Sequence, residues 1–566
     1  MKWQVTKNEI NKLKMSVQLK KLKLMIISLI TTSFTAGCQY QENSSVRDDV
    51  LVYCSEGSPE TFNPQLSTSG VTFDATSATI YNRLVEFKSG STQLKPALAT
   101  SWKVSKDGRE YTFKLRKNVA FHTTKLFIPT RTFNADDVLF SFQKQWFKNH
   151  PFYTSKKLSG SLGYSYFESM GLDGLIENII KIDPYTIKFR LSRAESPFLA
   201  TLAMDFASIL SAEYAQNLIQ TGSINNINNL PVGTGPFQLT RYQPDAFIRY
   251  KAHPNYWQGK AKFKHLVYAI TPDPSLRFAR LVAGECDVMS NPLPIHIKST
   301  SQFDNVEAIS SAGLNISFLS MNTQKKPFDN RQVRLAINHA INKEAIIKAV
   351  YQETATAAVT AIPPNMWAYN KKLKDHQYNP EKARRLLKKA GYPNGFEMEI
   401  WTTSAQRAYN PNAKKMAELI QQNLASVNIE VKIITYEFGT LLKKVRRGEH
   451  LTALMGWNGD NGDPDNFFTP LLSCASTVSG TNSAFWCDQS FNQLIFQARS
   501  QFNSRNRQRL YNRAQKIFKH AVPWVPIAHA TQHLIYNPRV KNLKIMPSGV
   551  INFDGITLKN NHGTEQ

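Results

Sequence analysis

Residues 396–436 read FEMEIWTTSAQRAYNPNAKKMAELIQQNLASVNIEVKIITY, and this stretch decides the fold class. Alternating residues predict a strand at 396–401, and a second strand follows at 429–436. Between them, the segment after Pro411 repeats its apolar residues at helical spacing. The order strand, helix, strand implies two parallel strands joined by a crossover helix. We therefore expect an α/β domain around this stretch.

Two helices and a further strand extend this pattern on both sides of the stretch. Asp329 is expected to cap a helix at 330–341. Asn379 stands before a proline and begins a second helix, which Gly391 ends. On the C-terminal side, a strand is predicted at 451–457. The α/β region therefore covers much of the second half of the chain.

The first half of the chain has a different pattern. A short strand is predicted at 51–53, and alternation at 111–115 and 186–191 predicts strands with one face in water, as in antiparallel sheets. Strand-like residues return at 533–536, so the end of the chain can rejoin the first half. The length of 566 residues, of which 42% are hydrophobic, fits two or three lobes.

The chain is strongly basic, with 69 Lys and Arg against 42 Asp and Glu and a formal net charge of +27. Such a charge favours an anionic partner, such as nucleic acid, a phospholipid surface or an acidic ligand. The basic residues are scattered, however, without an arginine-rich or aromatic-interleaved tract. We therefore expect no nucleic acid partner and interpret the charge as a solvated surface close to a membrane.

The N-terminal residues have the layout of an export signal. Lysines at 20, 21 and 23 precede an apolar run at 24–30, which is shorter than the roughly 20 residues that cross a bilayer. The small residues at 35–37 lead into Cys38 and resemble a lipoprotein processing site. We expect a signal peptide at 1–37, lipidation of Cys38 and a polar tether at 38–49.

Four cysteines remain if Cys38 carries lipid: Cys54, Cys286, Cys474 and Cys487. An even number in an exported chain favours disulfides, and three pairings are possible. Cys474 and Cys487 are close in sequence and suggest a local staple, which would leave Cys54 to reach Cys286. A metal site is the alternative, but the chain has no C-x-x-C and no neighbouring His at zinc spacing. We favour disulfides and expect no metal.

The sequence signatures of common enzymes are missing. The chain has no H-E-x-x-H, no G-x-S-x-G and no phosphate-binding loop. The glycines at 233 and 235 precede a proline, where a phosphate loop would need the start of a helix. Nothing positive supports catalysis, so we expect neither an enzyme nor a cofactor.

The densest polar motif is GWNGDNGDPDNFF at 456–468. Its three aspartates could bind calcium, but a proline interrupts them and no Glu follows at EF-hand spacing. A turn in which Asp and Asn side chains satisfy their own backbone is the plainer alternative. Because the motif follows a strand, Asp460 would lie in a crevice beside Trp457, where it could bind an ammonium group.

A second polar loop, QRAYNPN at 406–412, joins the strand at 396–401 to the helix that follows it. Arg407 offers a planar fork to a carboxylate, while Tyr409 offers a ring and a hydroxyl. A lone loop arginine is more often simply solvated. The carboxyl end of a strand is a ligand position, however, so Arg407 and Asp460 could hold the two ends of one zwitterion.

The opening LVYCSEGSPE at 51–60 and the run GDNGDPDNFF at 459–468 resemble bacterial extracellular solute-binding family 5, in particular its dipeptide-binding branch. Further segments that carry the resemblance are 62–66, 98–102, 107–108, 111–115, 134–138 and 231–237. Together they extend over roughly residues 50–560.

This resemblance implies a fold of the α/β class: a two-lobed periplasmic-binding-protein clamp of type II, cluster C, with mixed sheets. The large lobe would contain residues 50–313 and 531–566, and the second lobe would contain 314–530. It also implies the disulfides Cys54–Cys286 and Cys474–Cys487.

The resemblance further implies a ligand and partners. A dipeptide or short peptide would bind between the lobes, and an ABC permease would receive it. Carried over by motif, Asp460 would pair with the α-ammonium and Arg407 with the α-carboxylate. The other pocket residues would be Tyr409, Trp457, Thr68, Ser69 and Gly70. Lipoprotein relatives suggest heme or glutathione as alternative ligands. We expect a periplasmic monomer, held at a membrane by its lipid.

Overall fold

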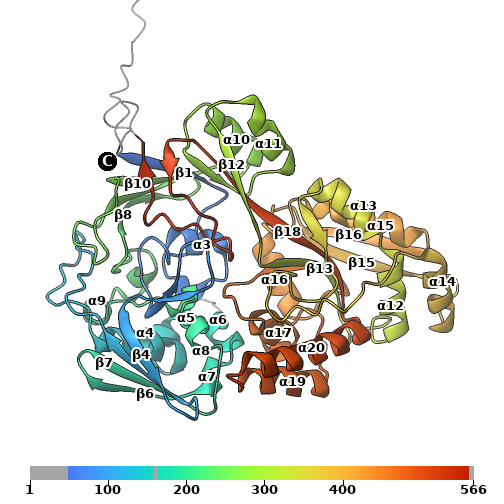
Figure 1. The fold of residues 1–566 in the computed structure, drawn as a ribbon, viewed down its shortest axis with the longest axis horizontal. Helices are drawn as coiled ribbons and strands as arrows, with labels where there is room; N and C mark the ends of the chain where they lie inside the picture. Colours follow the sequence, from blue (N-terminus) through green and yellow to red (C-terminus); the bar gives the residue numbers. More distant parts are fainter. Residues whose placement is uncertain (1–48, 159–162, 560–566) are drawn as a thin grey trace, which may run out of the picture. The chain divides into compact units, whose positions relative to one another are not determined.

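The computed structural model describes residues 49–158 and 163–559 (Figure 1). The predicted signal at 1–37, the predicted lipid site Cys38 and residues 39–48 of the predicted tether lie outside these ranges. Within the described ranges, no helix is both long enough and apolar enough to cross a membrane.

The stretch at 396–436 forms the predicted unit. Strand β15 (Phe396–Thr403) pairs in parallel with β16 (Ile429–Tyr436), and α15 (Ala413–Ala425) connects them. On its other side, β15 pairs in parallel with β17 (Thr452–Asn458). The prediction of parallel strands is therefore confirmed.

The two predicted helices upstream are present, and one of their caps differs from the prediction. Helix α14 (Pro380–Lys389) begins at Asn379, whose side chain accepts a hydrogen bond from the backbone N of Lys382 at 2.8 Å. Helix α12 (Arg331–Ala340) is capped by Asn330, not by Asp329. Asn330 has the extended backbone of a cap, whereas the Asp329 backbone N already donates to the Lys325 carbonyl within the preceding turn.

The first half of the chain contains the predicted antiparallel strands. A four-stranded sheet has the order β4-β5-β7-β6, and all of its pairs are antiparallel. Its strands are β4 (Ala99–Val104), β5 (Glu110–Leu115), β6 (Ile176–Asp183) and β7 (Thr186–Leu191).

A larger mixed sheet joins the two halves of the chain. Its order is β16-β15-β17-β13-β18-β11-β1-β10-β9-β8, and β12 and β14 also pair with β18. The strands not yet given are β1 (Val50–Ser55), β8 (Phe237–Gln243), β9 (Phe247–Ala252), β10 (His265–Ile270), β11 (Val288–Ser290), β12 (Glu307–Ala312), β13 (Asn315–Met321), β14 (Ala355–Ala357) and β18 (Trp524–Tyr536). Short two-stranded sheets are formed by β2 (Val85–Phe87) with β3 (Leu94–Pro96), and by β19 (Val540–Lys541) with β20 (Thr557–Leu558).

Strand β18 returns the chain to its first half. Its beginning pairs with β13, from Trp524 to Ala528. Its end pairs with β12 and β11, from Thr531 to Tyr536. Figure 1 shows this long strand beside β13 at one end and beside β12 at the other.

The helices cover these sheets in two groups. The first half of the chain carries α3 (Gly70–Ala75), α4 (Ala135–Trp146), α5 (Pro151–Leu158), α6 (Ser165–Ser169), α7 (Leu172–Leu175), α8 (Phe198–Thr201), α9 (Ala212–Gln220), α10 (Pro274–Val282) and α11 (Pro294–Ser299). The second half adds α13 (Lys343–Ile346), α16 (Phe438–Arg446), α17 (Asp465–Leu472), α18 (Ala475–Ser479), α19 (Gln489–Arg499) and α20 (Ser504–Ala521).

The buried apolar residues form separate cores. The largest core takes its buried members from residues 51–288 and 534–558. Two further cores lie entirely within residues 314–530. Trp457 is partly buried and packs against the largest core and against one of the other two. The side chain that sequence analysis placed in a ligand crevice therefore lies where two cores meet.

Candidate ligand-binding site

Two parallel strands bring the predicted binding loops together. Because β15 and β17 pair in parallel, the loops that follow them leave the same edge of the sheet. These loops carry Arg407 and Asp460 to one pocket. The pocket encloses about 1580 Å³ of empty space, including the part open to solvent. All seven predicted ligand-binding residues line it: Thr68, Ser69, Gly70, Arg407, Tyr409, Trp457 and Asp460.

Asp460 is a carboxylate without a cationic partner among the described residues. Its side chain accepts a hydrogen bond from the hydroxyl of Tyr166, a residue on α6 that is 294 positions away in sequence. Desolvation by the surrounding protein, helped by the charge of Asp205, raises the pKa of Asp460 to about 7. A buried carboxylate with a raised pKa is stabilised by any cation that enters the pocket beside it.

Asn466 holds Asp460 and Trp457 in place. Its side-chain oxygen accepts hydrogen bonds from the backbone N of Asp460 and from Nε1 of Trp457, both at 3.0 Å. The Trp457 ring lies 6.3 Å from that of Tyr166, measured between centroids. The buried side-chain amide of Asn466 therefore positions both Trp457 and Asp460.

The other aspartates of the motif serve the fold. Asp463 lies 2.8 Å from Nη2 of Arg507, and Asp465 accepts a hydrogen bond from the Thr469 hydroxyl at 2.6 Å. Asn461 and Asp463 also accept from backbone N atoms two residues ahead, both at 3.0 Å. Across residues 49–158 and 163–559, no three His, Cys, Asp or Glu side chains are grouped to bind a metal. The motif is therefore a braced turn that leaves Asp460 facing the pocket.

Arg407 places a positive charge on the other binding loop, the one that follows β15. Its guanidinium carbon lies 3.6 Å above the ring centre of Phe438, the first residue of α16. Its buried Nε finds no hydrogen-bond acceptor in the described part of the chain. Stacking fixes the plane of the guanidinium and leaves its N–H groups available for a carboxylate.

Tyr409 packs directly on the strand that leads to Asp460. A Cβ atom added at Gly456 would lie 2.2 Å from Cδ2 of the Tyr409 ring, so only glycine allows this contact. The backbone carbonyl of Tyr409 accepts a hydrogen bond from the Tyr351 hydroxyl at 2.8 Å. Burial raises the pKa of the Tyr409 hydroxyl.

The segment Thr68 to Gly70 reaches the pocket from the first half of the chain and ends at the first residue of α3. Ser67 braces it, because its hydroxyl accepts from the backbone N of Ser69 at 3.0 Å and donates to Glu60 at 2.8 Å. The pocket is therefore lined by residues from both halves of the chain.

Sequence analysis missed three residues that shape the pocket. Tyr166 lies far away along the chain, and nothing in its local sequence distinguishes it. Phe438 and Arg446 stand at the two ends of α16, where they look like ordinary members of an amphipathic helix. Only the packing of α16 against the pocket reveals them.

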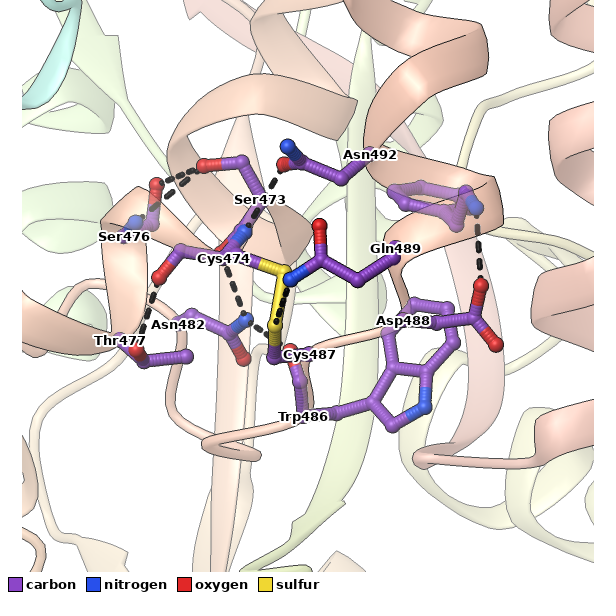
Figure 2. The surroundings of a disulfide bond; sticks show 11 residues. Ser473, Cys474, Ser476, Thr477, Asn482, Trp486, Cys487, Asp488, Gln489 and Asn492 are labelled. Atoms are coloured by element: carbon purple, nitrogen blue, oxygen red, sulfur yellow. Dashed lines mark hydrogen bonds between the residues drawn. A yellow bond between two sulfur atoms is a disulfide. The ribbon is translucent and has the colours of Figure 1, made fainter.

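Two disulfides cross-link the chain. Cys54 is joined to Cys286, and Cys474 is joined to Cys487, which are the pairs that the family resemblance implies. The second bond closes a short loop beside α19 (Figure 2). In that loop, the Asn482 side chain donates to the carbonyls of Ser473 and Trp486.

Comparison with known proteins finds a matching family and similar proteins over almost the whole chain. The model of bacterial extracellular solute-binding proteins, family 5, matches residues 93–479. The chain is 48% identical to the dipeptide-binding protein of Escherichia coli K12, over 96% of this chain and 100% of that protein. It is 42% identical to heme-binding protein A of Haemophilus influenzae, over 95% of this chain and 99% of that protein.

A solved structure agrees with these relatives. An ABC transporter-associated periplasmic binding protein from Helicobacter pylori, in complex with the peptide STSA, matches with a TM-score of 0.85 and 40% identity. The match covers 90% of this chain and 98% of the other. The family match, the identities and the shared two-lobed α/β fold lead to one conclusion: the chain belongs to the bacterial extracellular solute-binding proteins of family 5.

Proposed function

We propose that this chain captures dipeptides or other short peptides in the pocket and delivers them to an ABC permease. The observation that carries the proposal is the pair of uncompensated charges in one pocket. Asp460 has no cationic partner, and the Arg407 guanidinium has an unsatisfied buried N–H, within the described residues. A zwitterion supplies the two missing partners at once. The peptide ligands named for two relatives support the same reading.

We propose that the pocket captures its ligand by closure of two lobes about a hinge. We place the hinge near residues 313 and 531, with residues 50–313 and 531–566 in one lobe and 314–530 in the other. In support, β18 changes its pairing partner between Ala530 and Thr531. Strand β12 ends at Ala312, directly before the boundary at 313. The crossing at 531 lies within β18, and the crossing at 313 lies in the two-residue link between β12 and β13. Each is a single segment of chain, which can twist while the cores on either side stay intact.

The direct test is calorimetry with purified protein and a panel of dipeptides, with glutathione and hemin alongside. Wild-type protein is expected to bind dipeptides. Arg407→Gln and Asp460→Ala are each expected to lose a charge-assisted contact of about 1.5–3 kcal/mol. Glu430→Gln, on the exposed face of β16, is the matched control and should bind as the wild type does.

The other ligands give distinct outcomes. Saturable binding of hemin with a Soret shift, together with silence toward every peptide, would replace peptide capture by heme binding. Binding of glutathione alone would narrow the ligand class to that tripeptide. We propose no chemical step, and a bound peptide recovered unchanged in mass after prolonged incubation is the expected result.

We propose further that the protein is exported by residues 1–37 and held at a membrane by lipid on Cys38. Residues 38–49 would then act as a tether, and the protein would meet the permease as a monomer in the periplasm. Labelling with radioactive palmitate should mark the wild type and not Cys38→Ser. Equal labelling of the variant would reject Cys38 as the anchor.

A further inference from the structure

Arg446 is a second cation in the pocket, and neither the family match nor the two binding loops accounts for it. It ends α16, whose residues Phe438, Leu442, Val445 and Arg446 all line the pocket. These positions recur at helical spacing, so one face of the helix borders the ligand space. Its neighbour Arg447 is exposed and forms a salt bridge with Glu449 at 2.7 Å.

No acidic residue of the described ranges forms an ion pair with Arg446. In the described part of the chain, its guanidinium has no salt bridge within 4.0 Å and no hydrogen bond. Burial lowers its pKa, and Glu60 is the acidic group whose charge opposes this effect. Glu60 is itself exposed and accepts the Ser67 hydroxyl.

The acidic groups of the pocket do not pair with its two arginines. Burial raises the pKa of Asp460 to about 7 and the pKa of Asp74 well above its usual range. Glu56 is the third acidic residue of the lining. Among the described residues, none of these three carboxyl groups lies within 4.0 Å of the Arg407 or Arg446 guanidinium. Both cations are therefore open to carboxylates of a ligand, which favours a ligand with more than one carboxylate.

The disulfide-bonded loop fixes the end of α16 that carries Arg446. A Cβ atom at Gly480 would lie 2.1 Å from the carbonyl oxygen of Arg446, so the loop touches the helix end directly. Gly480 has a φ of +72°, a backbone conformation that favours glycine. The Cys474–Cys487 bond and the hydrogen bonds of Asn482 hold this loop (Figure 2). The disulfide-bonded loop therefore holds in place the end of α16 that carries Arg446.

We propose that Arg446 is an anion subsite of the pocket, which binds a carboxylate on a ligand side chain and gives acidic peptides an advantage over neutral ones. It lies eight positions after Phe438, on which Arg407 stacks, and this separation is about 12 Å along the helix. That span is roughly three extended residues. An α-carboxylate at Arg407 therefore leaves Arg446 for a different acid of the same ligand. The inference rests on the proposed peptide capture.

The test compares two isosteric peptide pairs in calorimetry: Glu-Ala with Gln-Ala, and Glu-Ala-Ala with Gln-Ala-Ala. The wild type is expected to bind at least one glutamate peptide about 10-fold to 100-fold more tightly than its glutamine partner. Arg446→Gln should remove that preference and leave the affinity for the glutamine peptides within about twofold. Arg447→Gln, one residue away and outside the pocket, should keep the preference.

Other results would overturn the inference. If the wild type binds all four peptides with no preference, Arg446 is not a subsite although peptide capture stands. If Arg446→Gln lowers the affinity for acidic and neutral peptides equally, Arg446 does not recognise the acidic side chain of the ligand. It would instead hold the lobes closed, with Glu60 as its partner. Silence of the wild type toward all four peptides would reject peptide capture itself, and the subsite with it. Each variant should unfold at the same midpoint temperature as the wild type, which shows that its fold is intact. Arg446→Lys should retain part of the preference for glutamate peptides.

Discussion

The raised pKa of Asp460 makes peptide affinity depend on pH below neutrality. An α-ammonium binds the ionised carboxylate, whereas the ligand-free protein holds a proton there up to about pH 7. With a pKa of about 7, the ionised fraction is about one half at pH 7 and about one hundredth at pH 5. Peptide affinity should therefore fall about 50-fold between these pH values.

The ligand does not contribute to this fall. A peptide α-amino group has a pKa of about 8, and its carboxyl has a pKa of about 3.5, so both stay charged between pH 5 and 7. Arginine side chains in general are not deprotonated in proteins. The whole effect is then assigned to Asp460 and to the acid group that acts on its pKa, Asp205.

The assay is calorimetry of Ala-Ala binding at pH 5, 6 and 7 in buffers of different ionisation enthalpy, which also counts protons. At pH 6 the release of about 0.9 proton per peptide is expected, because about nine tenths of the free carboxyls are protonated there. Asp460→Asn is the control; it should bind Ala-Ala more weakly, and its affinity should not change between pH 5 and 7. An affinity that is constant from pH 5 to 7 in the wild type, or an equal slope in the variant, would refute the reasoning.

Three further predictions concern the stability at different pH values, the contact at Gly456 and the Cys474–Cys487 disulfide. Because its folded-state pKa is raised, Asp460 favours the folded state below pH 4 relative to pH 8. Asp460→Asn should therefore unfold like the wild type near pH 4 but be more stable at pH 8, by at most about 4 kcal/mol in urea titrations; lower stability at pH 8 would contradict this. Gly456→Ala places a methyl group against the Tyr409 ring, so peptide affinity should fall at least about tenfold with the circular dichroism spectrum unchanged, and wild-type affinity would exclude the close contact. Replacing Cys474 and Cys487 by serine opens a loop with a sequence separation of 13 and should cost about 3 kcal/mol of unfolding free energy; an unchanged urea midpoint would show that other contacts hold the loop.

The elements that sequence analysis predicted best are those with local signals. Alternation and helical spacing within 396–436 predicted β15, α15 and β16 and their parallel pairing. The cap of α14 was predicted from Asn379 and the proline after it. At α12, two adjacent residues can both cap, and only the backbone at Asn330 decides between them.

The binding site was predictable where its residues follow strands. Arg407 and Asp460 come directly after β15 and β17, so parallel pairing alone brings them to the same edge of the sheet. Tyr166 could not be predicted, because its hydrogen bond to Asp460 spans 294 residues. The alignment of Arg446 with the pocket depends on how α16 packs, which no local pattern records.

The position of β18 in the chain has a consequence for synthesis. This strand stands between β13 and β11 in the order of the large sheet, yet its residues begin at 524 of 566. A chain that emerges from the ribosome N-terminus first cannot complete that sheet until almost all of it has been made. A prematurely terminated chain then lacks the strand that joins its two halves, and the edges of β13 and β11 that pair with β18 stay open.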